Sequence, residues 1–469
     1  MRKLVQRAAQ SAVGWGLFAI ALRFGSALLL LPLILRRLPP DELGLWYIFV
    51  SLGALALLVD LGFAPTIVRA AGYLWAGSRT LLPFGISLEE IENKPPRLPN
   101  LHLLADLVAS VRVYYLTLAG VLFLLLSGAG GAWVWHKSAG LTNANSIRAA
   151  FLVYAFGLSL GFAHNLWPSL LSGINAVRQV QQITAACLFA QVCLTAAGLV
   201  FGWKLWALVV GAVFAYVAER ITARIVFRQL SPLRHAKFDF SIIAVLWPNA
   251  WRSAAVGLGA YMILQASTLI CSAFLDLRTT ASYGLSLQAV TLLVGLSSIW
   301  VIAKMPTIYH LRAQGSLAQI ARIFRQRISL ALVTFVVGAI VLLSLGQNLL
   351  HHLHAQTLLL PRALLALLLI IQLLEMHHGL YGELVYSENV NPFVRPALIS
   401  GATIVILSLV FAPRFGLWGM LLATGAVQLC FNNWWPVRRA IRGLGPVGRN
   451  YWRGFIFAPP SSARADTSL

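Results

Sequence analysis

Long runs of apolar residues recur along this chain, and they restrict its fold more than any other feature. A helix that crosses a bilayer needs about 20 mostly apolar residues. Twelve runs approach or exceed that length, and the runs are continuous rather than alternating, which excludes a β-barrel. The sequence therefore predicts an all-α integral membrane protein with about 12 spans. The runs cover 12–35, 44–64, 108–135, 149–172, 183–202, 205–227, 251–275, 280–304, 328–347, 358–380, 394–411 and 416–436.

Composition and charge agree with this class. The chain of 469 residues is 59% hydrophobic and only 11% charged, with a mean hydropathy of +0.78. Its net charge of +22 would suggest nucleic acid in a soluble protein. With the first helix uncleaved and the N-terminus in the cytoplasm, about three quarters of the lysines and arginines fall on the cytoplasmic side. We therefore expect both termini in the cytoplasm, attraction to anionic membrane lipids, and no nucleic-acid partner.

The distribution of the runs predicts two lobes of six helices each. The hairpins "RRLPPDELGLWYIF" and "LDLRTTASYGLSLQ" both enter the next helix through Gly-Leu, at Gly44–Leu45 and Gly284–Leu285. Such a match is expected of two repeats related by a pseudo-two-fold axis along the membrane normal. The predicted divisions are an N-terminal lobe (1–232), a C-terminal lobe (233–443) and a cytoplasmic tail (444–469).

The longest predicted cytoplasmic connection precedes the third run. Ser87 and Glu90 form a capping-box pattern that starts a short helix. The stretch "NLHLLADLVASV", 100–111, has amphipathic spacing and is expected to lie on the inner membrane surface. We assign no role to the connection as a whole, 74–107.

Several short motifs, in order, resemble bacterial polysaccharide and O-antigen flippases (Wzx-like) of the MATE-like superfamily. The motifs are Glu42–Trp46, Asp60–Phe63, Thr66 with Arg69, Gly173–Asn175, Ser282–Gly284 and "FGLWGMLLATG" at 415–425. The resemblance implies a V-shaped bundle in the bacterial inner membrane, not an enzyme. It would carry a polyprenyl-diphosphate-linked oligosaccharide across by alternating access, for lipopolysaccharide O-antigen or exopolysaccharide synthesis. A polysaccharide polymerase and glycosyltransferases are the partners so implied.

Arg23 is the residue whose position most needs an explanation. It lies about 16 Å into the first span, near the midplane. A guanidinium there costs roughly 2.5–3.5 kcal/mol on insertion scales. It could bind an anionic headgroup, pair with Asp60 on the next span, or extend toward the interface. Asp60 is expected about 8 Å closer to the cytoplasm, which favours the headgroup. A cation here also favours an anionic cargo over a cationic drug.

Other polar residues in the spans are weaker candidates. Each has a structural alternative, such as an ordinary cytoplasmic charge, an ion pair or an interhelical hydrogen bond. For Asp60 the alternatives are fixing the turn before Gly62 or pairing with Arg69. The candidates for the phosphates are Arg69, Arg252 and Lys304, those for sugar hydroxyls are His164, Asn165 and Gln288, and those for proton or sodium coupling are Asp60 and Glu375.

Two other functions compete with a flippase. A cation-coupled multidrug exporter of the same superfamily would need membrane carboxylates for its substrate, whereas the first helix offers Arg23. An O-antigen polymerase or ligase is expected to use a large outward loop, and the predicted outward loops are short. The four cysteines all fall inside apolar runs without a metal-ligand spacing, so we expect no metal and no cofactor apart from a coupling ion.

Overall fold

The computed structural model describes residues 12–82, 98–231, 236–388, 390 and 392–452. All regular elements in these ranges are helices, which confirms the all-α class. Ten helical stretches there are long and apolar enough to cross a membrane. They account for every predicted run after the first, because Val394–Arg442 contains the last two. The first run forms α2, and the non-helical Gly416 (φ 56°, ψ −138°) separates the last two within α19.

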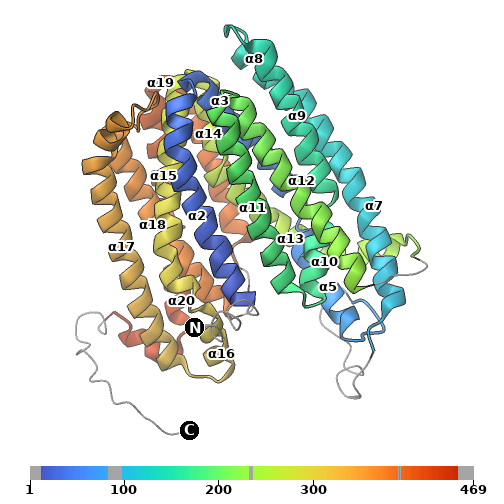
Figure 1. Ribbon diagram of the computed structural model, residues 1–469. Coiled ribbons are helices and arrows are strands. Elements are labelled where there is room, and N and C mark those ends of the chain that lie inside the picture. Colours follow the sequence, from blue (N-terminus) through green and yellow to red (C-terminus); the bar gives the residue numbers. More distant parts are fainter. Residues whose placement is uncertain (1–11, 83–97, 232–235, 389, 391, 453–469) are drawn as a thin grey trace, which may run out of the picture.

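The N-terminal half begins with α2, which packs along α11 (Figure 1). Several of its spans are built from two or more consecutive helices. The elements are α2 (Ala12–Arg37), α3 (Pro40–Gly53), α4 (Leu55–Val59), α5 (Phe63–Trp75), α7 (Leu101–Leu125), the π-helix η1 (Leu126–Gly130), α8 (Gly131–Ser138), α9 (Ala144–Ala163), α10 (Leu166–Gly173), α11 (Val177–Val200) and α12 (Leu205–Leu230).

The C-terminal half repeats this plan. Its first two spans are also divided, between α13 and α14 and between α15 and α16. The elements are α13 (Phe240–Leu264), α14 (Ala266–Phe274), α15 (Leu277–Ile302), α16 (Met305–Ala313), α17 (Leu317–His352), α18 (Arg362–Tyr386), α19 (Val394–Cys430), α20 (Trp435–Arg442) and the 3-10 helix η2 (Gly445–Asn450).

The stretch at 100–111 does not form a surface helix, contrary to our expectation. It is the start of α7, and Leu104, Leu107 and Val111 are fully buried in the N-terminal core. Asn100 caps this helix by accepting a hydrogen bond from the Leu103 amide (3.1 Å). The amphipathic spacing therefore marks a helix face buried against protein rather than lipid. The predicted helix start at Ser87 and Glu90 lies outside the described residues.

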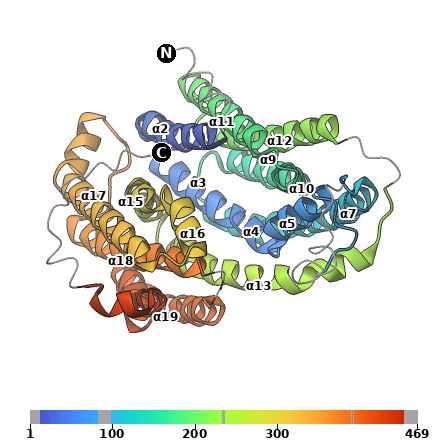
Figure 2. The same ribbon diagram turned by 90° about the horizontal axis from the view of Figure 1, so that it is seen from below.

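Two hydrophobic cores occupy the two halves. One is built mainly from residues 45–250 and the other mainly from residues 270–451. Seen from below, α5, α7, α9, α10, α11 and α12 gather on one side and α15 to α19 on the other (Figure 2). We call these groups the N-lobe and the C-lobe. The residue boundaries given above for the lobes stay a prediction.

The two lobes are joined at the end of the molecule that holds the hairpins, which we call the outer end. The Tyr47 hydroxyl donates to Gln288 Oε1 (2.6 Å), and Ser51 Oγ donates to the Gln265 carbonyl (2.8 Å). A Cβ on Gly44 would collide with the Leu277 carbonyl, and one on Gly284 with the Tyr47 ring. The Gly-Leu pairs seen in the sequence are thus where α3 and α15 approach most closely.

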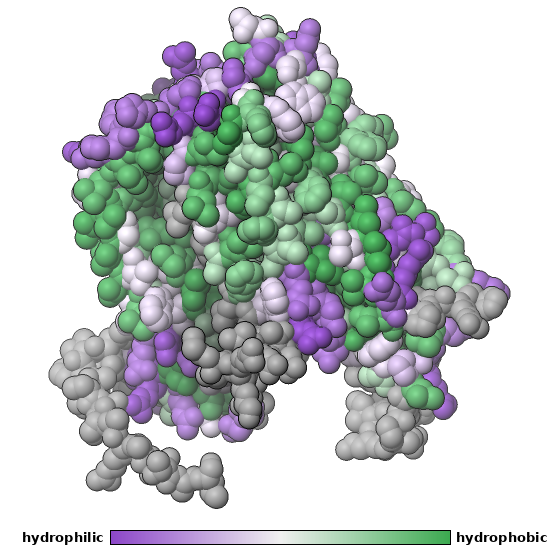
Figure 3. All heavy atoms as spheres, in the orientation of Figure 1, coloured by the Kyte–Doolittle hydropathy of each residue, from purple (hydrophilic) through white to green (hydrophobic). Residues whose placement is uncertain are grey.

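The opposite end, where α2 begins and α12 ends, is the inner end. The space-filling view shows that the inner end is hollowed between two projecting parts of the molecule, one from each lobe (Figure 3). The molecule is therefore sealed at the outer end and open between the lobes at the inner end. That the inner end faces the cytoplasm stays a prediction from the charge distribution.

Candidate functional site

Two N-lobe spans are interrupted by polar residues. Between α4 and α5 the chain turns at Asp60, Leu61 (φ 50°) and Gly62 (φ 71°). Glycine is needed at 62 because this backbone is left-handed and a Cβ there would collide with the Ala250 carbonyl of α13. Between α9 and α10 the helix stops at His164 and Asn165. These breaks bring short polar side chains into the lobe.

Asp60 is the centre of this polar region and is only 8% exposed. Its Oδ1 accepts hydrogen bonds from the Tyr115 hydroxyl (2.5 Å) and from Asn165 Nδ2 (3.4 Å). Its Oδ2 accepts from the Ala64 amide (3.2 Å), at the start of α5. The carboxylate therefore ties together both helix breaks and α7, and it holds the turn that separates α4 from α5.

The same network continues to α12 and α11. Arg220 donates from Nη2 to Asn165 Oδ1 (3.4 Å) and from Nη1 to Glu219 Oε2 (3.2 Å). Thr184 Oγ1 donates to Glu219 Oε1 (2.7 Å). We call Asp60, Tyr115, Asn165, Arg220 and Glu219 the Asp60 network. It places two carboxylates and one guanidinium inside the lobe, with each carboxylate held by at least two donors.

The C-lobe has a smaller polar group around Glu375 on α18. Glu375 Oε2 lies 3.8 Å from His378 Nε2, and His378 Nδ1 lies 3.0 Å from Asn433 Oδ1. Asn432 Nδ2 donates to Gln428 Oε1 (2.6 Å). Glu375 Oε1 and Gln428 Nε2 are buried and make no well-formed hydrogen bond, although the Gln428 side chain is close enough to interact with the Glu375 carboxylate. A buried carboxylate oxygen that lacks a partner is costly, so this group is able to accept a proton or a cation.

The predicted cations lie on four different helices or helix junctions. Arg23 lies on α2, and its side chain is outside the described part of the chain. Arg69 on α5 is exposed and donates to Thr66 Oγ1 (3.5 Å). Arg252 on α13 has its guanidinium 6.0 Å from the Trp251 ring, and Lys304 lies half-buried between α15 and α16. Their roles toward a substrate stay predictions.

The three residues predicted to bind sugar hydroxyls make different contacts in the structure. Asn165 joins Asp60, as described above. Gln288 accepts from Tyr47, so it links the lobes as the interhelical alternative requires. His164 Nδ1 lies 3.0 Å from the Leu160 carbonyl of its own helix. Of the two structural alternatives for Asp60, the structure shows the turn and not a bond to Arg69.

Sequence reasoning missed Tyr115, Glu219 and Arg220 as members of the site. Arg220 entered only as one of many cytoplasmic positive charges, and Tyr115 as part of an apolar run. One signal was present, because Glu219 and Arg220 are adjacent charges of opposite sign within a spanning run. Such a pair is costly in a membrane unless both side chains face protein or water.

Comparison with known proteins gives a fold and no sequence family. No family model matches, and no curated protein matches in sequence. An inward-facing MATE multidrug resistance transporter of the MOP superfamily matches with a TM-score of 0.60. That match has 11% identity and covers 91% of this chain and 94% of the other. The chain has the fold of the MATE transporters of the MOP superfamily.

Two further structures give the same fold. The outward-facing form of a MATE multidrug resistance transporter matches with a TM-score of 0.53 and 12% identity, over 91% of this chain and 94% of that one. A MOP superfamily transporter from Pyrococcus furiosus, whose binding pocket is described as reversed in polarity, matches with a TM-score of 0.53 and 10% identity. It covers 93% of this chain and 96% of the other. The narrower flippase resemblance stays a prediction.

Proposed function

We propose that this protein is an alternating-access transporter that carries a polyprenyl-diphosphate-linked oligosaccharide across the bacterial inner membrane. The observation that carries the proposal is a MOP fold sealed at the outer end and hollowed at the inner end (Figure 3). The higher TM-score against the inward-facing form, 0.60 against 0.53, supports the same state. Rocking of one lobe against the other would expose the cargo to either side.

The charges of the N-lobe support an anionic cargo. Each carboxylate in its described spans is bound within the protein: Asp41 by Arg278, Glu42 by Asn143, Asp60 by Tyr115, Asp106 by the Lys237 amide and Glu219 by Arg220. In contrast, Arg69 on α5 forms no ion pair in the described part of the chain. Unpaired guanidinium groups suit a diphosphate, and Arg23 would add one near the midplane.

Coupling to protons or sodium ions is part of the proposal and involves Asp60 and Glu375. The partnerless Oε1 of Glu375 also favours a second candidate function, a cation-coupled multidrug exporter. Such an exporter needs a carboxylate for its substrate, and the matched structures include multidrug resistance transporters. In the flippase proposal, glycosyltransferases would supply the cargo and a polymerase would consume it.

The test uses proteoliposomes that contain the purified protein. A fluorescent undecaprenyl-diphosphate oligosaccharide is the first probe and the cationic dye ethidium is the second. We expect movement of the lipid-linked probe, no movement of ethidium, and a loss of at least tenfold in Arg23→Ala. Arg322→Gln, an exposed arginine on α17, is the control and should flip normally. Ethidium transport without flipping would establish the exporter instead.

A further inference from the structure

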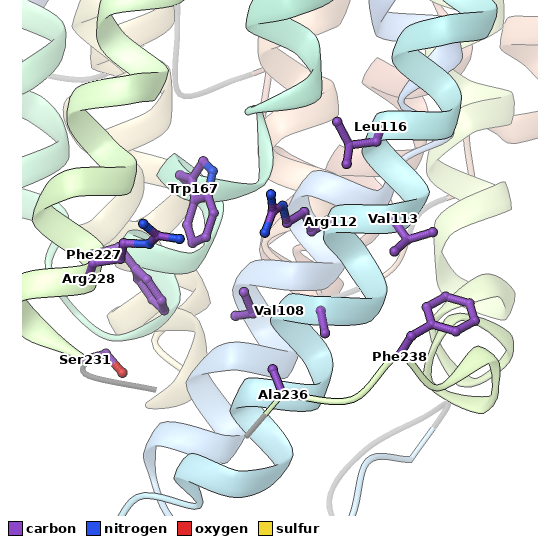
Figure 4. A pocket seen from close by; sticks show the side chains of 11 residues that line it. Val108, Arg112, Val113, Leu116, Trp167, Phe227, Arg228, Ser231, Ala236 and Phe238 are labelled. Carbon is purple, nitrogen blue, oxygen red and sulfur yellow. The ribbon is translucent and has the colours of Figure 1, made fainter. Parts of the chain in front are cut away.

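A cavity of about 700 Å³ lies on the N-lobe, between α7, α10 and α12 near the inner end. It is separate from the Asp60 network, and none of the predicted site residues lines it. Figure 4 shows Arg112 of α7 reaching toward Trp167 of α10, with Arg228 of α12 beside Phe227 on the other wall. The linker, which we define as residues 236–239 before α13, lines the edge of the cavity with Ala236 and Phe238.

Three arginines concentrate positive charge around this cavity. Arg224 lies one helical turn before Arg228, and its guanidinium is 5.8 Å from the Trp167 ring. It is close enough to Arg228 and Arg112 to interact electrostatically with both. Its Nε is buried without a hydrogen-bond partner. None of the three forms an ion pair in the described part of the chain, and Arg112 and Arg228 are exposed, so the three guanidinium groups are available to bind an anion.

An apolar track leads away from the cavity along α7. Val113 and Leu116 line the cavity and are 45% and 50% exposed. Gly120 and the 70% exposed Leu124 follow at helical spacing on the same face, and a Cβ on Gly120 would meet open space. A cationic cavity next to an exposed apolar helix face has the two parts needed for a phosphate headgroup and a hydrocarbon chain.

The linker, 236–239, connects this cavity to α13, which packs against α5 and α7 of the N-lobe and against α19 of the C-lobe. Asp106 Oδ1 accepts from the Lys237 amide (2.8 Å), and Ser110 Oγ accepts from the Asp239 amide (2.9 Å). Asp239 in turn caps α13 by accepting from the Ser241 amide (2.8 Å), and hydrogen bonds from the side chain and backbone of Ser241 lower the pKa of the Asp239 carboxyl. A ligand in the cavity therefore contacts both the N-lobe and the linker that leads into α13.

We propose that this cavity binds the phosphate of an anionic phospholipid from the inner leaflet, with an acyl chain along the α7 track. The arginines would recognise the phosphate ester, and bidentate guanidinium contacts suit its oxygens. By holding the linker against α7, the bound lipid would stabilise the arrangement of the lobes that is open at the inner end. This inference is independent of which cargo the protein carries.

The test compares lipid binding by native mass spectrometry of the full-length protein in detergent. The probes are dioleoyl phosphatidylglycerol and dioleoyl phosphatidylcholine, which share their chains and differ in net charge. We expect the Arg112→Gln/Arg228→Gln variant to bind phosphatidylglycerol about thirtyfold more weakly, given about 1 kcal/mol per arginine near an anionic lipid. Phosphatidylcholine binding should change little. The Arg322→Gln control should bind both lipids as the wild type does.

A second variant keeps every arginine in place. Ala109→Glu puts a carboxylate at the cavity wall, three residues from Arg112 on α7, and should weaken phosphatidylglycerol binding as the arginine changes do. Glycerol 3-phosphate, which has the phosphate but no chain, should not displace the lipid at millimolar concentration. Unchanged phosphatidylglycerol binding in both variants would overturn the proposal. Displacement by glycerol 3-phosphate would identify a soluble phosphate site instead.

Discussion

The two lobes share a fold, but the carboxylates inside them differ in how many hydrogen-bond partners they have. In the N-lobe, Asp60 and Glu219 each accept at least two hydrogen bonds, and Arg220 adds a compensating charge. In the C-lobe, Glu375 has a histidine contact at 3.8 Å and the Gln428 amide beside its carboxylate, but one oxygen makes no well-formed hydrogen bond. A satisfied network rigidifies the structure around it, whereas an unsatisfied group has capacity for another ligand. We infer that the N-lobe carboxylates hold structure and that, of the two proposed coupling residues Asp60 and Glu375, Glu375 exchanges a proton or sodium ion more readily.

The largest effect should come from breaking the Asp60 network. Asp60→Ala leaves the Tyr115 hydroxyl, Asn165 Nδ2 and the Ala64 amide without their acceptor. Each buried donor that loses its partner costs about 1–3 kcal/mol, so we expect a loss of about 3 kcal/mol in unfolding free energy. Denaturant unfolding in detergent, followed by circular dichroism, measures it.

A conservative variant sharpens this prediction. Asp60→Asn keeps a carbonyl oxygen that can still accept from Tyr115, so its cost should be about 1 kcal/mol. If Asp60→Ala unfolds as easily as Asp60→Asn, the network does not hold the two helix breaks together, and the difference between the lobes would vanish.

How much of this could be predicted from sequence depends on the range of the interaction. Spanning helices were predictable because each is a local apolar run, as α17 and α18 show. The partners of Asp60 were not, because Tyr115 and Asn165 are 55 and 105 residues away and meet it only after the lobe has packed. Amphipathic spacing at Leu104 and Leu107 also failed to distinguish a protein-facing surface from a membrane-facing one.

The roles of the repeated glycines could be predicted from the sequence only in part. The repeated Gly-Leu at 44–45 and 284–285 predicted symmetry, and the structure adds the reason for it, since a side chain at either glycine would separate α3 from α15. The C-lobe equivalent of the Asp60 turn shows the limit of such matching. "APTIV" at 64–68 and "MPTIY" at 305–309 both start a short helix after a break, yet Asp60 has only apolar counterparts near 301. The repeat thus keeps the position of the helix break, but the C-lobe break lacks both the left-handed backbone of Leu61 and Gly62 and the carboxylate of Asp60.

An intermediate effect is expected where the lobes touch. Gly284→Val would push the Tyr47 ring aside and break its bond to Gln288. Overpacking of this kind costs about 1–3 kcal/mol, and here it acts only on the state that is closed at the outer end. We therefore expect the outer end to open. The reporter is Ser51→Cys, placed in a chain whose four native cysteines are serine and labelled with a membrane-impermeant maleimide.

The matched control for this experiment is Gly257→Val on α13, where a Cβ meets open space. It should leave the labelling rate at Ser51→Cys unchanged, whereas Gly284→Val should raise it at least tenfold. Equal rates in the two variants would mean that α3 and α15 do not form the outer seal.

Of these variants, Glu375→Gln should have the smallest effect on the unfolding free energy. It should nevertheless have a large effect on transport. The substitution removes a carboxylate that has few donors, so the unfolding free energy should change by less than about 1 kcal/mol. Transport driven by a proton or sodium gradient should nevertheless fall at least tenfold, because the exchangeable site is gone. Glu383→Gln is the control, since Glu383 lies on the same helix, is also half-buried and should carry no coupling. A stable Glu375→Gln protein with full gradient-driven transport would move coupling back to Asp60. The lobe with the satisfied carboxylate would then also be the lobe that exchanges its ion.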